Sequence, residues 1–174
     1  MKFYLMDWRG PYTYDEAIHD TTLENGLYAI TGIRKNKINN KKNIKLQYIG
    51  KTKTTLGTRF NDKSHYVHQV NRELGIWFGK IRNKRVDDLL FIEHMFIRFS
   101  PEKDKFNKQN KERLPTESGV VISNFFNKEM NRQYIRLPPP VRCIPEVIIW
   151  DQKMNEEVFR YTKRLQIESV KQQE

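Results

Sequence analysis

One glutamate, Glu93, lies in an apolar segment where a charged side chain is costly. The spacing of apolar residues from Asp88 to Phe99 predicts a helix. At 100° per residue Glu93 falls about 40° from Leu89, inside the apolar arc, whereas His94 and Arg98 fall opposite. A carboxylate facing a core must be paired, protonated or bound to a metal. This helix alone leaves both a salt bridge and a metal-binding role open.

A second feature with chemical consequences is a window without acidic residues, from Asn25 to Asn61. Over the whole chain, 32 Lys and Arg against 21 Asp and Glu give a net charge of +11. Part of the basic window, 34–42, is an Asn- and Lys-rich loop that is either solvated or extends into a groove. Lys51 and Lys53 instead lie beside a strand pattern and are fixed to a scaffold, so we expect them to bind substrate phosphates. The window's basic residues are Arg34, Lys35, Lys37, Lys41, Lys42, Lys45, Lys51, Lys53 and Arg59.

The elements that must position these residues indicate an α+β fold. Strand-forming runs at 27–33 and 44–50, joined by the basic loop, predict an antiparallel hairpin, and 75–81 predicts a third strand. The threonines at 52, 54 and 55 offer N-caps for a helix through Val70, with a break near 61–62. A short strand at 2–6, a helix opened by the capping-box pattern of Thr13, and a helix after Pro115 are also expected.

The length of 174 residues favours one folded domain. We expect an N-terminal extension at 1–24, a core at 25–136, and a C-terminal extension at 137–174 that packs on the core. The proline run 138–140 opens this last part, which should hold a strand near 145–150 and a helix at 154–166. The single cysteine, Cys143, excludes an internal disulfide. Without a signal-peptide core or an apolar span, a cytoplasmic protein with no membrane partner is expected.

The motifs exclude several common chemistries and favour one. There is no complete phosphate-binding GxxxxGK[ST] loop, HExxH or G-x-S-x-G pattern. Instead Gly26-Leu27-Tyr28 precedes Tyr48-Ile49-Gly50-Lys51, followed by Arg59 and by Glu93. In this order, over about 26–107, the chain resembles the GIY-YIG nuclease family, with Asn107 in the place of its downstream asparagine.

The resemblance implies a three-stranded antiparallel sheet flanked by helices and metal-dependent hydrolysis of phosphodiesters, usually in DNA. Tyr28 would be the general base, provided that nearby cations such as Lys51 lower its pKa, and Tyr48 would orient water or phosphate. Arg59 would bind the scissile phosphate. Glu93 would hold a single Mg²⁺ or Mn²⁺, and Asn107 would position that glutamate or the substrate.

Two departures from the family pattern bear on the site. The tyrosines are 20 positions apart (48 − 28), so the 34–43 loop resembles an insertion. The family often places a histidine or tyrosine one turn after the arginine, where this chain has Lys63. On an unbroken helix Tyr66 would replace it, whereas a break at 61–62 favours His65, which we take as the catalytic residue.

The leading hypothesis is therefore a metal-dependent endonuclease acting on DNA, with RNA not excluded as a substrate. A homodimer is expected if both strands are cut. The alternatives are a catalytically inactive nucleic-acid-binding module with the same fold, and a protein-interaction domain whose charge serves solubility.

Overall fold

The computed structural model describes residues 2–34, 44–82, 88–99, 119–127, 134–135, 137–151, 157–161 and 167–169. These residues form an α+β fold, as the sequence predicts. The elements are β1 (Lys2–Tyr12), α1 (Tyr14–His19), β2 (Glu24–Arg34), β3 (Lys45–Thr55), α2 (Leu56–Phe60), η1 (Tyr66–Gln69), β4 (Val70–Ile81), α3 (Leu89–Phe99), β5 (Val120–Asn127), β6 (Tyr134–Ile135), η4 (Pro139–Val141), β7 (Val147–Trp150), β8 (Glu157–Tyr161) and β9 (Ile167–Ser169).

All of the described strands belong to one mixed sheet with the order β3-β2-β4-β1-β5-β7-β8-β9, in which β6 pairs with β5. The three antiparallel strands predicted from the sequence are β2, β3 and β4. The expectation that the sheet ends there was wrong. Segment 1–24 contributes β1, which pairs antiparallel with β4 and parallel with β5. The three strands are one part of a larger sheet, and among the described strands β3 is at its edge.

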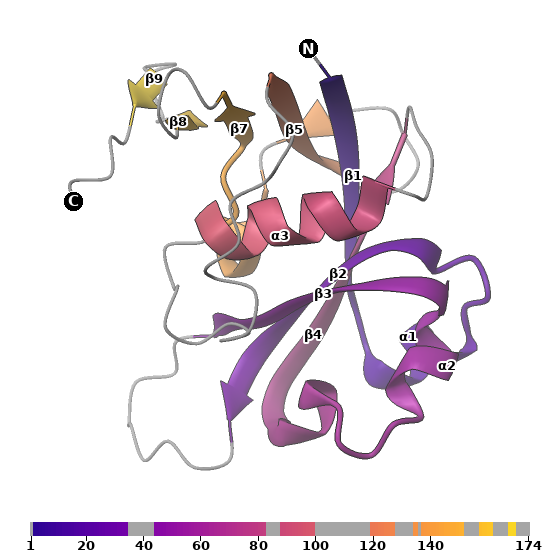
Figure 1. Cartoon of the computed structure of the whole chain (residues 1–174). Helices are drawn as coiled ribbons and strands as arrows, with labels where there is room; N and C mark the ends of the chain where they lie inside the picture. The colour runs from indigo at the N-terminus through magenta and orange to yellow at the C-terminus, as the bar shows by residue number, and fades with distance from the viewer. Residues whose placement is uncertain are drawn as a thin grey trace.

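Two hydrophobic cores lie on opposite faces of the part of the sheet that β2, β3 and β4 form. Figure 1 shows α3 lying across the strands, apart from α1 and α2. On one face α3 packs across the strands and buries Ile92 and Phe96 against Leu27 and Ile49. On the other face α1, α2 and η1 pack on Tyr28 and Tyr48 and their neighbours. Because side chains alternate along a strand, the buried apolar residues of β2 and β3 are divided between the two cores.

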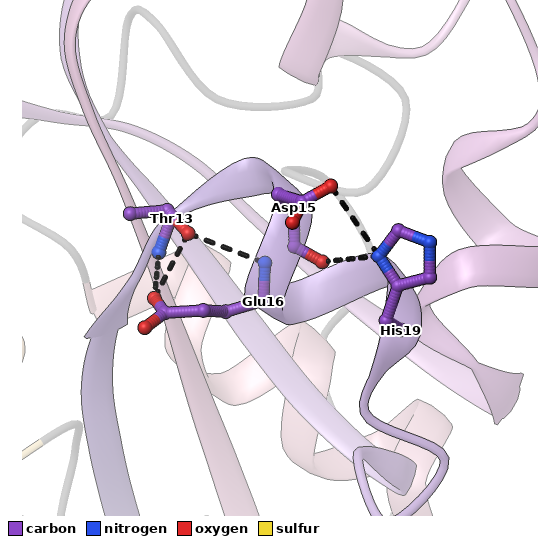
Figure 2. A network of polar contacts seen from close by, with 4 residues as sticks. All are labelled: Thr13, Asp15, Glu16 and His19. Atoms are coloured by element: carbon purple, nitrogen blue, oxygen red, sulfur yellow. Dashed lines mark hydrogen bonds and ion pairs between the residues drawn. The ribbon is translucent and has the colours of Figure 1, made fainter.

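Helix α1 supports the short helix α2 that follows β3. The Thr13 side chain caps α1 by accepting from the backbone N–H of Glu16, whose carboxylate accepts in return from the backbone N–H of Thr13 (Figure 2). The backbone of α1 then lies so close to α2 that a Cβ on Gly57 would be 2.4 Å from the carbonyl oxygen of Ile18. A glycine is therefore required where the two helices meet.

The helix predicted from the threonines to Val70 is present only in part, because Thr52 and Thr54 lie in β3, Thr55 caps the short helix α2, and Val70 begins β4. The expected break near residues 61–62 is confirmed. Helix α2 ends at Phe60, and Asp62 Oδ1 then accepts hydrogen bonds from the backbone N–H and the hydroxyl of Ser64. Such a turn competes with helical hydrogen bonds, so the chain changes direction before η1 begins at Tyr66.

Two helix predictions in the second half of the chain were wrong. The segment after Pro115 was expected to be helical, but residues 120–127 form β5, with burial alternating along the strand as β-branched and aromatic residues favour. The C-terminal helix expected at 154–166 is contradicted at 157–161, which form β8. The strand predicted near 145–150 is confirmed as β7, and Leu137 and Ile148 belong to the α3-side core. Among the described helices, none is long and apolar enough to cross a membrane.

Candidate functional site

The phenol of Tyr28 is the centre of a buried hydrogen-bond network. Tyr28 lies on β2 and is fully buried. Arg59, from the last turn of α2, donates its Nε–H to the phenol oxygen at 3.3 Å. His65, which caps η1, places its Nε2 2.8 Å from the same oxygen. Three predicted site residues from three separate elements therefore meet at one atom.

The hydrogen bonds of His65 determine which partner donates. The backbone N–H of Val67 donates to His65 Nδ1 at 3.2 Å, so this nitrogen carries no proton. Burial, and secondarily the positive charge of Arg59, lowers the pKa of His65 to about 4, so the ring is neutral at pH 7. The single ring proton of His65 is therefore on Nε2, and it points to Tyr28.

Two donors consequently converge on the phenol oxygen of Tyr28. Neither of them uses the hydroxyl hydrogen of Tyr28, which can be donated to a further acceptor. If that hydrogen leaves, the same two donors stabilise the phenolate that remains, because hydrogen bonds to a charged oxygen are stronger than those to a neutral one. This geometry suits a proton acceptor or a donor to a phosphate oxygen.

The pKa of Tyr28 does not follow the expectation from the sequence. Burial raises it above the ordinary value for a tyrosine, and the neighbouring Tyr48 adds to the rise, while Arg59 opposes both. The cation that was expected to lower it, Lys51, lies on the other face of the sheet. Among the described residues desolvation therefore outweighs the cationic neighbour, and the phenol is neutral at pH 7.

Aromatic rings and one glycine fix the position of the phenol. The Tyr28 ring meets Phe60 edge to face, with centroids 5.4 Å apart, and meets Tyr48 at 5.8 Å. A Cβ on Gly50 would lie 2.6 Å from the Tyr28 hydroxyl and 2.6 Å from a ring carbon of Tyr48. Because only a hydrogen fits there, the glycine of the Tyr48-Ile49-Gly50 triplet allows the Tyr28 hydroxyl to lie over β3.

Glu93 lies in a different environment, on the face covered by α3. Its side chain is 7% exposed, and its Oε2 accepts from the Nζ of Lys51 at 3.0 Å. The salt bridge that the sequence left open is therefore present. The Lys51 side chain keeps 28% of its surface exposed, so the pair lies at the margin of the core.

The predicted site residues are thus divided between two faces of β3. Tyr48 belongs to the core of the α2 side and Ile49 to the core of the α3 side, so the alternation puts Gly50 with Tyr28 and Lys51 with Glu93. Lys53 is exposed two residues further along β3. The two groups remain neighbours along the chain, because Gly50 and Lys51 are consecutive in a strand at the edge of the sheet. Asn107 lies outside the described residues, as do 35–43 of the basic loop.

The donors around Glu93 decide whether a metal ion fits there. Within the described residues no group of three His, Cys, Asp or Glu side chains could hold a metal ion. Mg²⁺ often uses only one or two carboxylates and completes its shell with waters and phosphate oxygens. A single carboxylate such as Glu93 fits that requirement, but Lys51 must move or share the carboxylate for an ion to bind.

The sequence did not identify two residues that shape this site. Val67 fixes the tautomer of His65 through its backbone, and no side-chain pattern can reveal such a role. Phe60 acts by ring contact with Tyr28, which depends on how α2 packs on the sheet. No protein-family model, curated protein or solved structure matches this chain.

Proposed function

We propose that the protein is a metal-dependent endonuclease of the GIY-YIG type that hydrolyses phosphodiester bonds in DNA. The observation that carries this proposal is the convergence of Arg59 Nε and His65 Nε2 on the phenol oxygen of Tyr28. A buried tyrosine of the core does not need a cationic donor, whereas a tyrosine that exchanges a proton with water benefits from both.

In the proposed reaction the neutral Tyr28 phenol first loses its hydroxyl proton to solvent, and its two donors stabilise the phenolate that remains. This phenolate then takes a proton from the attacking water. The Arg59 guanidinium is on the exposed side of the network, where its remaining N–H groups suit a phosphate oxygen. Tyr48 packs on Tyr28 and holds the ring in place. Binding of the negatively charged backbone relies on exposed cations at the β3 edge such as Lys53.

Glu93 would hold Mg²⁺ or Mn²⁺, which when bound supplies charge neutralisation at the phosphate. Because Glu93 and Tyr28 face opposite sides of β3, the substrate has to pass around the edge of the sheet at Gly50 and Lys51. An edge strand is open to such an approach, since no further described strand pairs with β3. We propose DNA rather than RNA, and a homodimer if both strands are cut.

The experiment that tests this function is nicking of supercoiled plasmid DNA with Mg²⁺ and with EDTA. We expect nicking only with the metal, and a loss of at least about 100-fold in Glu93→Ala, since the metal neutralises charge on the reacting phosphate. Glu24→Ala, a change of an exposed glutamate on β2, is the matched control and should retain wild-type activity. Equal activity in Glu93→Ala and wild type would remove Glu93 from the mechanism.

A second candidate, a nucleic-acid-binding module without turnover, is favoured by the ion pair of Glu93 with Lys51. A carboxylate that is already neutralised by a lysine has less need for a metal. This candidate predicts salt-dependent DNA binding, with no cleavage in Mg²⁺ or Mn²⁺.

A further inference from the structure

A row of three aromatic rings leads from the buried network to the protein surface. The ring of Tyr48 lies 5.8 Å from that of Tyr28, and the ring of Tyr66 stacks on Tyr48 at 4.9 Å with an interplanar angle of 21°. Burial falls along the row: Tyr28 is fully buried, Tyr48 is 6% exposed and Tyr66 is 37% exposed. The Tyr66 ring, the most exposed of the three, therefore presents aromatic surface to solvent.

Tyr66 shares a neighbouring ring with Arg59, the arginine proposed to bind phosphate. Arg59 donates to Tyr28 and also interacts electrostatically with Tyr48, the ring on which Tyr66 stacks. Arg59 and Tyr66 therefore both border Tyr48. The adjacent residue, His65, supplies the hydrogen bond to Tyr28, so the proposed reaction does not use Tyr66.

We infer that Tyr66 is a stacking surface for one unpaired nucleobase of a DNA strand whose phosphate is bound by Arg59. This rests on the proposed function and adds the substrate class, DNA with single-stranded or unpaired nucleotides at the site. An exposed tyrosine stacked on a second ring is a rigid platform for a base, and a neighbouring cation complements the backbone charge. In a duplex both faces of each base are covered by its neighbours, so only an unstacked base can lie on Tyr66.

The test is fluorescence anisotropy of a labelled oligonucleotide of about 12 nucleotides, single-stranded or paired with its complement, in EDTA. We expect the wild type to bind the single strand more tightly than the duplex. Tyr66→Ala should weaken single-strand binding about 10-fold and leave duplex binding unchanged, because stacking on one aromatic ring contributes about 1–3 kcal/mol per base. Tyr66→Phe keeps the ring and should bind within about twofold of wild type.

The matched control is Ile44→Ala, which shortens another exposed apolar side chain near β3 without removing a ring. It should bind both oligonucleotides as the wild type does. The inference is overturned if Tyr66→Ala binds the single strand as tightly as the wild type, or loses single-strand and duplex binding equally. Circular dichroism confirms that each variant is folded, and Tyr66→Phe tests the ring even if Tyr66→Ala is unstable.

The binding measurement separates this inference from the nuclease proposal, because no cleavage occurs in EDTA. A selective loss of single-strand binding together with no Mg²⁺-dependent cleavage supports the stacking surface and overturns the nuclease. Mg²⁺-dependent cleavage by the wild type, together with wild-type single-strand binding by Tyr66→Ala, supports the nuclease and overturns the stacking surface.

Discussion

The Nε2 of His65 lies 2.8 Å from the phenol oxygen of Tyr28, and the backbone of Val67 makes this nitrogen the donor. A buried neutral histidine in such a contact couples the stability of the fold to pH, because protonation of Nδ1 breaks the hydrogen bond from Val67.

The first prediction concerns the pH dependence of unfolding. The pKa of His65 is lowered to about 4 in the folded protein, whereas a histidine in an unfolded chain titrates near about 6.5. Between these values the unfolded chain binds a proton that the folded protein does not. The contribution of this group is therefore fully present above about pH 6.5 and is lost as the pH falls toward about 4.

Urea unfolding at about pH 7 and about pH 4.5 measures this loss of stability. Comparison with His65→Gln separates the contribution of His65 from that of the other titrating groups. We expect the wild type to lose roughly 1–3 kcal/mol more than His65→Gln over this interval. His19→Gln, which alters a histidine whose side chain is 72% exposed, should follow the wild type. If the wild type and His65→Gln lose the same free energy of unfolding over this interval, the lowered pKa of His65 is contradicted.

The second prediction concerns the close approach of Gly50 and Tyr28. In Gly50→Ala the new methyl group meets the Tyr28 hydroxyl at 2.6 Å, so the phenol must move away from His65 and Arg59. We expect a loss of about 1–3 kcal/mol in the free energy of unfolding, as for other overpacked sites, together with loss of cleavage. The double variant with Tyr28→Phe should be more stable than the sum of the single effects predicts, because removing the hydroxyl relieves part of the clash. Strict additivity would mean that the two residues do not clash.

The third prediction concerns the Lys51–Glu93 pair. Lys51→Met leaves a carboxylate that is 7% exposed without this cation, whereas Glu93→Gln leaves a lysine that can reach water. We expect Lys51→Met to lower the free energy of unfolding more, by about 1–3 kcal/mol, and Glu93→Gln to cost less. Mg²⁺ should raise the Tm of Lys51→Met more than that of Glu93→Gln if the carboxylate binds the ion. If the two variants lose the same free energy of unfolding and gain the same Tm with Mg²⁺, then Glu93 neither needs Lys51 as its partner nor binds the ion.

The fourth prediction concerns phosphate binding at the edge of the sheet. Lys53 is exposed on β3, beyond Lys51. If it contacts a DNA phosphate, Lys53→Ala reduces the slope of log affinity against log salt concentration by about 1, independently of DNA sequence. Lys80→Ala removes the same charge from an exposed position on β4, two strands from β3, and should leave the slope closer to the wild-type value. A larger change of slope in Lys80→Ala than in Lys53→Ala would place the DNA away from β3.

The strands around the site could be predicted from the sequence because each contains a run of strand-forming residues next to glycine, although all three are longer than those runs. Strand β1 was predicted only as a short strand in an extension, because Met6, Asp7 and Trp8 are buried in succession and hide the alternation of an ordinary strand. Strand β8 was predicted as a helix because the apolar spacing from Val158 to Tyr161 also fits helical periodicity.

The contacts of the site could be predicted only in part. The role of His65 depended on a chain break near residue 61, which the Asn-Asp pair indicated, but the direction of η1 after that break follows from the turn at Asp62. The face on which Glu93 lies relative to Tyr28 depends on how α3 packs, which is a tertiary property. The ion pair with Lys51 was among the alternatives, and only the packing of α3 on β3 selected it.

The most direct test of the central claim is the rate at which Tyr28→Phe nicks supercoiled plasmid in Mg²⁺, relative to the wild type. The phenol oxygen is the acceptor for Arg59 and His65, so its removal should lower the rate at least about 100-fold while the ring still packs on Phe60. Tyr12→Phe, a change of a half-buried tyrosine on β1, should retain the wild-type rate. Equal nicking by Tyr28→Phe and wild type, or no metal-dependent nicking by the wild type, would contradict the account.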